Sequence, residues 1–194
     1  MTTLHLVRHG RPVPDEGPAE RWELDASAGE ELSALRTSGA LPQWARWFSS
    51  PEPKARGTAR ALTGTAVGFV DGLREMTRPA QAWLGSGAWA AVVRRSLTDL
   101  DVPAQDGWET GRATAERVVA AVRRIQDSCP DDDLVLVGHG TAWTLLVAAL
   151  TDGPADVDAW ERLRMPDHCV LELPGSTDAA ARILAPWGSW AGAA

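Results

Sequence analysis

Two of the four histidines in this chain of 194 residues stand beside glycines at the ends of short apolar runs. His9 lies in the segment Arg8–Gly10 after "LHLV", and His139 lies in Gly138–Gly140 after "LVLV". Imidazole is well suited to nucleophilic attack or proton transfer near neutral pH. A neighbouring glycine lets another chain segment or a ligand approach closely. The two histidines therefore mark a candidate site.

Other chemically active side chains follow the remaining apolar runs. Lys54 comes after "ARWF", and Arg74 and Glu75 come after "GFVDGL". In open α/β sheets, ligands bind beyond the carboxyl ends of the strands. If these runs are neighbouring strands, two histidines, an acid and several cations meet at one rim. His5, inside the first run, and His168, at the start of a late run, are interpreted as structural.

Strands and helices alternate along most of the chain. We expect strands at 4–7, 45–50, 66–73, within 131–140, at 168–174 and at 181–187, and helices at 28–38, 51–62, 87–99, 109–129 and 141–150. This order predicts an α/β fold with a mainly parallel central sheet and helices on both faces. Residues 1–194 are predicted to form one domain, in which 76–108 is a short helical excursion over the rim. Residues 11–26 are expected to form a loop.

Charge and composition exclude several classes of function. The net charge is -7 at pH 7 and no basic stripe is present, which argues against a nucleic-acid partner. A small phosphorylated ligand remains compatible with this charge, because a few converging cations hold one phosphate. No apolar run approaches the roughly 20 residues of a membrane span, and the first residues lack a signal-peptide pattern. We therefore expect a cytoplasmic protein without membrane contact, and the heavy use of alanine and arginine indicates a bacterial genome of high GC content.

Four segments carry a family resemblance. They are "LVRHG" at 6–10, "SSP" at 49–51 with "TA" at 58–59, "LRE" at 73–75 and "VGHG" at 137–140. In this order and spacing, residues 4 to about 145 resemble the histidine phosphatase (phosphoglycerate mutase-like) superfamily. The segment "GWETGRATAERV", which contains Glu109, and the late strand "HCVLEL" are also similar to the family.

The resemblance implies catalytic roles for four residues. His9 would be the nucleophile that forms a phosphohistidine, which water then hydrolyses. Arg8 would hold the phosphate through its planar guanidinium, and His139 would donate to the transferring phosphoryl group. Glu75 would protonate the leaving oxygen and later activate water. No metal or other cofactor is implied, and the expected partner is a small phosphorylated metabolite.

The chain departs from the family at the second phosphate-binding cation. The family pattern "SSPLxRAxxTA" has arginine where this chain has Lys54, its single lysine. Arg56 comes two residues later, and residues two apart on a helix are rotated by about 200° and do not share a face. Ser50 is expected to cap this helix, with Pro51 and Pro53 in the first turn. Lys54 would then lie beside free amides that favour phosphate. We interpret it as the second phosphate-binding cation, whose ammonium is a point charge in place of the two-pronged guanidinium of arginine.

Two further features leave alternatives open. Arg11 is either a secondary contact for the substrate phosphate or a surface residue. Trp22, Trp83 and Trp89 either line a pocket for an apolar or ring-bearing substrate or pack in the protein interior, which is the commoner use of tryptophan.

The function that the sequence favours is a phosphomonoesterase that hydrolyses a small phosphorylated substrate through a phosphohistidine. One alternative is a phosphotransferase of the phosphoglycerate mutase type, which the short 76–108 excursion and the short chain disfavour. Another is a pseudo-phosphatase that binds a phosphorylated ligand without turnover. The lysine substitution permits this second alternative, whereas retention of Arg8, His9, Glu75 and His139 disfavours it.

Overall fold

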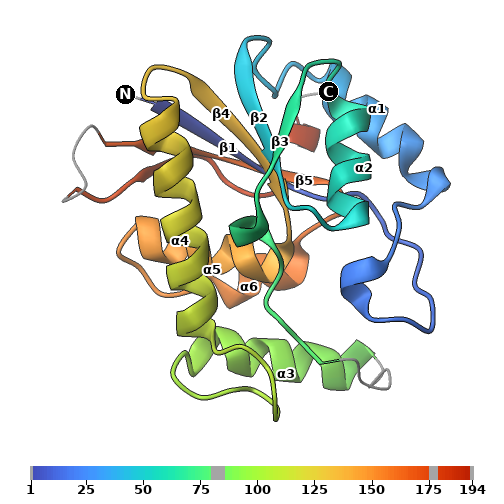
Figure 1. Cartoon of the computed structure of the whole chain (residues 1–194), viewed down its shortest axis with the longest axis vertical. Coiled ribbons are helices and arrows are strands. Elements are labelled where there is room, and N and C mark those ends of the chain that lie inside the picture. Colours follow the sequence, from blue (N-terminus) through green and yellow to red (C-terminus); the bar gives the residue numbers. More distant parts are fainter. Residues whose placement is uncertain (1, 80–85, 175–178, 193–194) are drawn as a thin grey trace.

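The computed structural model describes residues 2–79, 86–174 and 179–192, which form an α/β fold around one central sheet (Figure 1). Within these ranges the sheet has six strands in the order β3-β2-β4-β1-β5-β6. Their bounds are β1 Thr2–Arg8, β2 Ala45–Ser49, β3 Val67–Phe69, β4 Asp133–Gly138, β5 Asp167–Leu173 and β6 Arg182–Ala185. Strands β3, β2, β4 and β1 are parallel, whereas β5 and β6 are each antiparallel to the preceding strand in the order. The predicted mainly parallel sheet is confirmed.

The two central strands bring the two glycine-flanked histidines together. β1 and β4 are parallel, with Arg8 opposite Gly138, so both strands end at the same edge of the sheet. A histidine follows each strand end, and the amide of His9 donates to the carbonyl of Gly138 at 2.9 Å. This register places His9 and His139 at one rim because the carboxyl ends of parallel strands meet there.

Helices cover both faces of the sheet, as predicted (Figure 1). One face carries α4 (Gly111–Ser128) and α5 (Gly140–Leu150), and the other carries α1 (Gly29–Thr37) and α2 (Pro53–Leu62). The alternation of β1 explains the two cores, since successive side chains of a strand point to opposite faces. Leu4 and Leu6 belong to the core under α4 and α5, and Val7 belongs to the core under α1 and α2.

The excursion forms a third, smaller core beyond the rim. Its helix α3 (Ser86–Thr98) lies within one residue of the predicted bounds and contacts α5 and α6 (Val157–Arg162). Val93 and Trp108 are buried there together with Leu145 of α5. Figure 1 shows α3 at one end of the molecule, past the ends of α4 and α5. The excursion is therefore packed against the body of the protein.

Two hydrogen bonds close the neck of this excursion. The amide of Thr77 donates to Oε2 of Glu109 at 2.9 Å, and the amide of Glu109 donates to the carbonyl of Thr77, also at 2.9 Å. The chain that leaves the body at residue 77 is thus joined directly to the chain that returns at residue 109.

Helix α2 starts differently from the prediction. It begins at Pro53 with Glu52 as its N-cap, so Ser50 is not the capping residue. The first amides of the helix are also already used, because Pro53 has no N–H and the amide of Lys54 donates to the carbonyl of Trp22 at 3.2 Å. The prediction of an amide-rich phosphate site at this helix start is therefore wrong.

Three further elements differ from the sequence prediction. β3 is short and leads into a 3-10 turn at Asp71–Leu73, so the strand expected at 66–73 ends early. The expected loop at 11–26 contains one 3-10 turn at Ala19–Arg21, and a second at Ala26–Ala28 overlaps its end. α6 was not predicted, and it has only six residues. Across the described ranges, no helix is long and apolar enough to cross a bilayer.

Candidate active site

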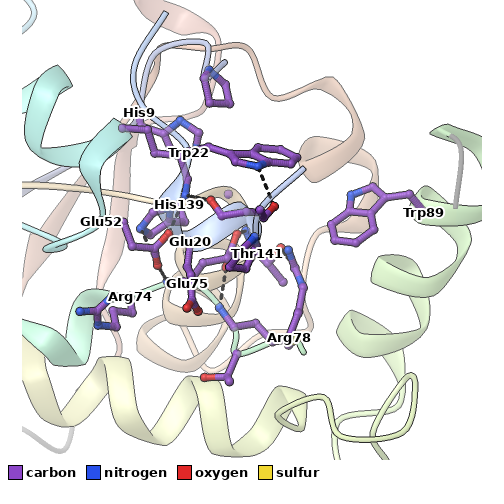
Figure 2. A pocket seen from close by; sticks show the side chains of 18 of the residues that line it. His9, Glu20, Trp22, Glu52, Arg74, Glu75, Arg78, Trp89, His139 and Thr141 are labelled. Atoms are coloured by element: carbon purple, nitrogen blue, oxygen red, sulfur yellow. Dashed lines mark hydrogen bonds and ion pairs between the residues drawn. The ribbon is translucent and has the colours of Figure 1, made fainter. Parts of the chain in front are cut away.

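A cavity of about 740 Å³ lies at the carboxyl ends of β1, β2 and β4 (Figure 2). Five of the six predicted site residues line it, namely Arg8, His9, Lys54, Glu75 and His139. A cavity of this size accommodates a whole small molecule and is much larger than a phosphate group requires. The sequence prediction of one convergent site therefore agrees with the geometry for these five side chains.

His9 is held in one tautomer by the backbone that follows it. Its Nδ1 lies 2.7 Å from the carbonyl oxygen of Gly10, which only accepts hydrogen bonds, so the proton is on Nδ1. Nε2 is then the nitrogen with a free lone pair. Burial, followed by the nearby His139, Arg8 and Lys54, holds the pKa of His9 well below its usual value of 6.5. The ring is consequently neutral and suited to nucleophilic attack.

His139 packs edge-on against His9, with 5.2 Å between the ring centroids. It is fully buried, and its Nε2 lies 2.8 Å from the hydroxyl of Ser50. Its Nδ1 is buried without a hydrogen-bond partner among the described residues. Burial first, and then the positive charge of Lys54, lower the pKa of His139 to about 3. A neutral imidazole with one unused ring nitrogen thus borders the cavity.

Arg8 is fixed at the end of β1 by backbone oxygens. Its Nη1 donates to the carbonyl of Leu163 at 2.8 Å and, at 3.4 Å, to that of Arg164. A Cβ on Gly140 would lie 3.2 Å from Nε of Arg8, so the glycine gives the guanidinium room beside the start of α5. None of these contacts neutralises the positive charge, which is left for an anion in the cavity.

The carboxylate of Glu75 occupies the N-terminus of α5. Its oxygens accept from the amides of Ala142 at 2.9 Å, Thr141 at 3.2 Å and Met76 at 2.9 Å. Burial alone would raise the pKa of Glu75, but the charge of Arg78, the proximity of His139 and these amides outweigh burial and lower the pKa to about 2. The free amides and dipole of a helix start favour such an anion. Glu75 is therefore ionised at neutral pH.

Arg117 of α4 holds the segment that carries Glu75. It donates to the carbonyls of Gly72 at 2.9 Å, Arg74 at 3.0 Å and Glu75 at 3.2 Å. The same guanidinium forms a two-bond ion pair with Glu109, at 2.9 and 2.7 Å. Glu109, which the sequence singled out only by resemblance, thus links the neck of the excursion to the backbone of Glu75.

Lys54 reaches the cavity already paired. Its Nζ donates to Oε2 of Glu52 and to the carbonyl of Ala19, both at 2.6 Å. The other carboxylate oxygen of Glu52 accepts from the amide of Glu75 at 2.9 Å and lies 3.4 Å from Nε2 of His139. Glu52 is therefore a buried acid at the centre of the site that sequence reasoning missed. Its only signal was that it stands where the family pattern has leucine.

Two arginines that the sequence analysis considered point away from the cavity. Arg11 does not line the cavity, and its guanidinium forms an exposed ion pair with Glu31 at 2.5 Å, so the structure does not bring it to the phosphate. Arg56 lies over the ring of Phe69, 5.1 Å from its centroid, and is also absent from the lining. The inference that Lys54 and Arg56 face opposite ways agrees with this arrangement.

Aromatic side chains form another part of the cavity lining. Trp22 and Trp89 line it, whereas Trp83 lies outside the described residues. Sequence reasoning missed Arg78, Trp108 and Trp160, which line the same region. No local pattern marks these three residues. Among the residues that the structure describes, no group of three or more His, Cys, Asp or Glu side chains is arranged to hold a metal ion.

Comparisons with solved structures show the same fold. Mycobacterial glucosyl-3-phosphoglycerate phosphatase in complex with inorganic phosphate is similar with a TM-score of 0.77 and 23% identity, over 98% of this chain and 99% of that chain. A mutant phosphoserine phosphatase from Entamoeba histolytica in complex with phosphoserine has a TM-score of 0.75 and 15% identity, over 98% of both chains. YhfR from Bacillus stearothermophilus has a TM-score of 0.76 and 19% identity, over 95% of this chain and 96% of that chain.

The sequence itself matches one family model. No match was found among curated proteins. Residues 4–183, which include every cavity-lining side chain described above, match the model of the histidine phosphatase superfamily, branch 1. The strand-end histidines, the parallel sheet and this match agree, and the chain belongs to the histidine phosphatase superfamily.

Proposed function

We propose that this protein is a phosphomonoesterase that hydrolyses a small phosphorylated metabolite through a phosphohistidine on His9. The observation that carries the proposal is the hydrogen bond from Nδ1 of His9 to the carbonyl of Gly10, which leaves Nε2 unprotonated at the cavity. A neutral imidazole beside the free cation Arg8 has the two properties that phosphoryl transfer needs, a nucleophile and a preorganised positive charge.

In the first step, Nε2 of His9 attacks phosphorus and the bond from phosphorus to the leaving oxygen breaks. Arg8 holds two of the phosphoryl oxygens, Lys54 contributes its remaining N–H, and His139 donates from its ring to a third. Glu75 gives a proton to the leaving oxygen, so the alcohol departs neutral. In the second step, water attacks phosphorus, its proton passes to the carboxylate of Glu75, and the phosphorus–nitrogen bond breaks.

The proton for the first step enters with the substrate. Glu75 is ionised at neutral pH because its pKa is about 2. The second pKa of a phosphomonoester is about 6, so the monoanion is well populated in mildly acidic solution. In the complex, the negative charge of the phosphoryl group beside Glu75 raises the affinity of this carboxylate for a proton, so the proton of the monoanion passes to Glu75 and then to the leaving oxygen.

Hydrolysis is favoured over the two alternatives. The two named enzymes among the similar structures above are both phosphatases, one of glucosyl-3-phosphoglycerate and one of phosphoserine. Arg8, His9, Glu75 and His139 all line one cavity, which a protein that only binds phosphate does not require.

The test is to trap the phosphoenzyme. Protein mixed with a phosphate-labelled substrate and quenched in alkali is expected to carry label that acid removes, whereas His9→Ala carries none. His168→Gln, a histidine change outside the cavity, is the matched control and is expected to label normally. Label that persists in His9→Ala would overturn the assignment of the nucleophile. Release of label as inorganic phosphate supports hydrolysis, whereas transfer to an alcohol acceptor would support the mutase alternative.

A further inference from the structure

Arg78 presents a fixed positive charge in the part of the cavity away from His9. Its guanidinium carbon lies 4.7 Å from the ring centroid of Trp89 and 4.9 Å from that of Trp108. Its Nη2 donates to the hydroxyl of Thr141 at 2.9 Å. Figure 2 shows Arg78 between Glu75 and Trp89, with His9 on the far side of the cavity. Aromatic faces and a hydroxyl together hold the guanidinium plane in one orientation.

The charges of the cavity-lining cations are not equally available. Lys54 is paired with Glu52 at 2.6 Å, and Arg74 is paired with Asp71 at 3.1 Å. In the part of the chain that the structure describes, no carboxylate lies within 4.0 Å of the guanidinium nitrogens of Arg8 or Arg78. Two cations therefore remain without a direct counter-ion.

These two cations serve different parts of the cavity. Arg8 adjoins His9 in the chain and lowers its pKa by its charge, so it belongs with the transferring phosphoryl group. Arg78 instead shares Thr141 with Glu75, because the hydroxyl of Thr141 accepts from Arg78 and its amide donates to Glu75. Since Glu75 faces the leaving oxygen in the proposed reaction, Arg78 faces the alcohol part of the substrate.

We propose that Arg78 binds a second anionic group, a carboxylate or a second phosphate, on the alcohol part of the substrate. The substrate class is then phosphomonoesters of anionic alcohols. This inference rests on the proposed function, since it assigns the substrate of the same site. Its basis is the guanidinium fork, which matches two anionic oxygens at once, and the Nε–H of Arg78, which is buried with no partner among the described residues.

Binding of this group also affects proton transfer. The positive charge of Arg78 is the largest of the influences that lower the pKa of Glu75. An anion on Arg78 neutralises that charge, so the affinity of Glu75 for a proton rises in the complex. A substrate with the second anionic group thereby favours the protonated carboxyl that its own leaving oxygen needs.

The acidic residues on the rim do not argue against an anion at Arg78. Asp15, Glu16 and Glu20 line the outer cavity, but all three are exposed. Their charges are screened by solvent and salt, whereas the charge of Arg78 is held against aromatic rings inside the cavity. An inner anion is therefore favoured over a cation at Arg78.

The test compares substrates that differ only in the second charge. Glycerol 3-phosphate carries a CH2OH group where 3-phosphoglycerate carries a carboxylate, and propyl phosphate lacks the second phosphate of propane-1,3-diyl bisphosphate. We expect kcat/KM to favour the doubly anionic member of at least one pair by on the order of 10–100-fold, the effect of one hydrogen-bonded charge. Which pair shows the preference distinguishes carboxylate from phosphate.

Variants assign the preference to Arg78. Arg78→Gln is expected to abolish the ratio within the preferred pair, and Arg78→Lys to retain part of it, because a charge without a fork remains. Arg74→Gln, which changes another cavity-lining arginine, is the matched control and is expected to leave the ratio unchanged. Thermal unfolding of each variant verifies that it folds.

Three outcomes would overturn the inference. In the first, the wild-type enzyme shows no preference for the doubly anionic substrate in either pair. In the second, Arg78→Gln slows both members of a pair equally. In the third, Arg74→Gln removes the preference. Failure of the proposed function looks different, because wild-type enzyme would then hydrolyse no phosphomonoester, including p-nitrophenyl phosphate. In that case calorimetric binding of 3-phosphoglycerate and glycerol 3-phosphate to wild-type and Arg78→Gln protein still tests the inference.

Discussion

Oε2 of Glu52 accepts a hydrogen bond from Nζ of Lys54 at 2.6 Å, and the exposed fractions of the two side chains are only 3% and 6%. With the carbonyl of Ala19 as a second acceptor, two of the three N–H donors of the ammonium are in use. The lysine can thus offer a phosphate one hydrogen bond and a charge that Glu52 partly offsets. In the proposed reaction, Arg8 therefore carries the larger share of phosphate recognition.

Lys54→Ala is expected to lower kcat/KM by a factor of about 10²–10³, which is the typical effect of removing one preorganised donor to a developing charge. Arg56→Ala is the matched control and is expected to stay near wild type, because Arg56 stacks on Phe69 outside the cavity. Lys54→Arg is expected to keep substantial activity, since the positive charge remains. Steady-state kinetics on p-nitrophenyl phosphate measure all three.

A second variant separates catalysis from folding at this pair. Lys54→Ala leaves the buried carboxylate of Glu52 unpaired, which costs about 3–5 kcal/mol of folding free energy. Glu52→Gln combined with Lys54→Met removes both charges and is expected to regain most of that stability without regaining rate. Wild-type rates in the double variant would show that Lys54 serves only to balance Glu52.

Glu75→Gln is expected to affect substrates according to their leaving groups. An alkyl phosphate needs its leaving oxygen protonated, whereas p-nitrophenolate departs with little help. The variant should therefore lose far more rate on an alkyl phosphate than on p-nitrophenyl phosphate. Rate constants for both substrates, measured with wild type and variant, give the ratio. Equal losses on the two substrates would assign Glu75 a structural role at the start of α5.

Arg117 is expected to act on the rate through Glu75. Arg117→Gln removes the hydrogen bonds to the carbonyls around Glu75, so kcat should fall by about tenfold with alkyl phosphates, a shift of about 1.4 kcal/mol in the activation barrier. Because the effect passes through Glu75, Arg117→Gln should add no further loss in a Glu75→Gln background. Arg124→Gln, an exposed change on the same helix, is the control. Additive losses in the double variant would rule out this positioning role.

The stacked pair His5 and His168 is expected to make stability depend on pH. Nδ1 of His5 lies 3.1 Å from Nε2 of His168, and burial followed by the charge of His5 lowers the pKa of His168 from 6.5 to about 4. The unfolded chain therefore binds more protons than the folded one between these values, so the free energy of unfolding decreases as the pH falls from 6.5 to about 4. One such group contributes a slope of about 1.4 kcal/mol per pH unit.

Urea denaturation at several pH values between 7 and 4 measures this slope. His168→Gln is expected to show a shallower decrease than wild type, because one of the titrating groups is gone. Identical slopes for the two proteins would mean that the pair does not contribute to acid sensitivity.

Local sequence patterns predicted the part of the site that lies at strand ends. His9 and His139 each follow an apolar strand and border a glycine, and the parallel register of β1 and β4 is enough to bring them together. Glu75 was also predicted, although its contact with the start of α5 depends on residues 66 or 67 positions further along the chain. Short-range patterns thus identified His9, Glu75 and His139 at the rim.

The pairing of Glu52 with Lys54 was not predictable in the same way. A helix that began at residue 51 would place these two side chains on different faces. The observed helix begins at Pro53, and Glu52 has the extended conformation of an N-cap, which lets its carboxylate turn back to Lys54. A shift of two residues in the helix start decides whether the single lysine is free or paired, and boundaries of this kind are the least certain part of sequence prediction.

Arg78 was missed because its surroundings are assembled by tertiary packing. Trp89 and Trp108 lie 11 and 30 residues further along the chain and meet the guanidinium only when the excursion folds against α5. Arg11 was considered for the opposite reason, its proximity to His9 in sequence. The side chain turns outward to Glu31 of α1, a contact that no pattern near residue 11 announces.

The hydrogen-bonded neck between Thr77 and Glu109 makes residues 78–108 an exchangeable cassette. Both ends of the segment are anchored to each other and, through Arg117, to the backbone of Glu75. A graft of different length or composition between positions 77 and 109 would replace Arg78, Trp89 and Trp108 while it leaves His9 and Glu75 on their own supports. Diversification confined to this cassette should therefore change the substrate range of the proposed phosphatase, and a cassette without Arg78 should also raise the pKa of Glu75.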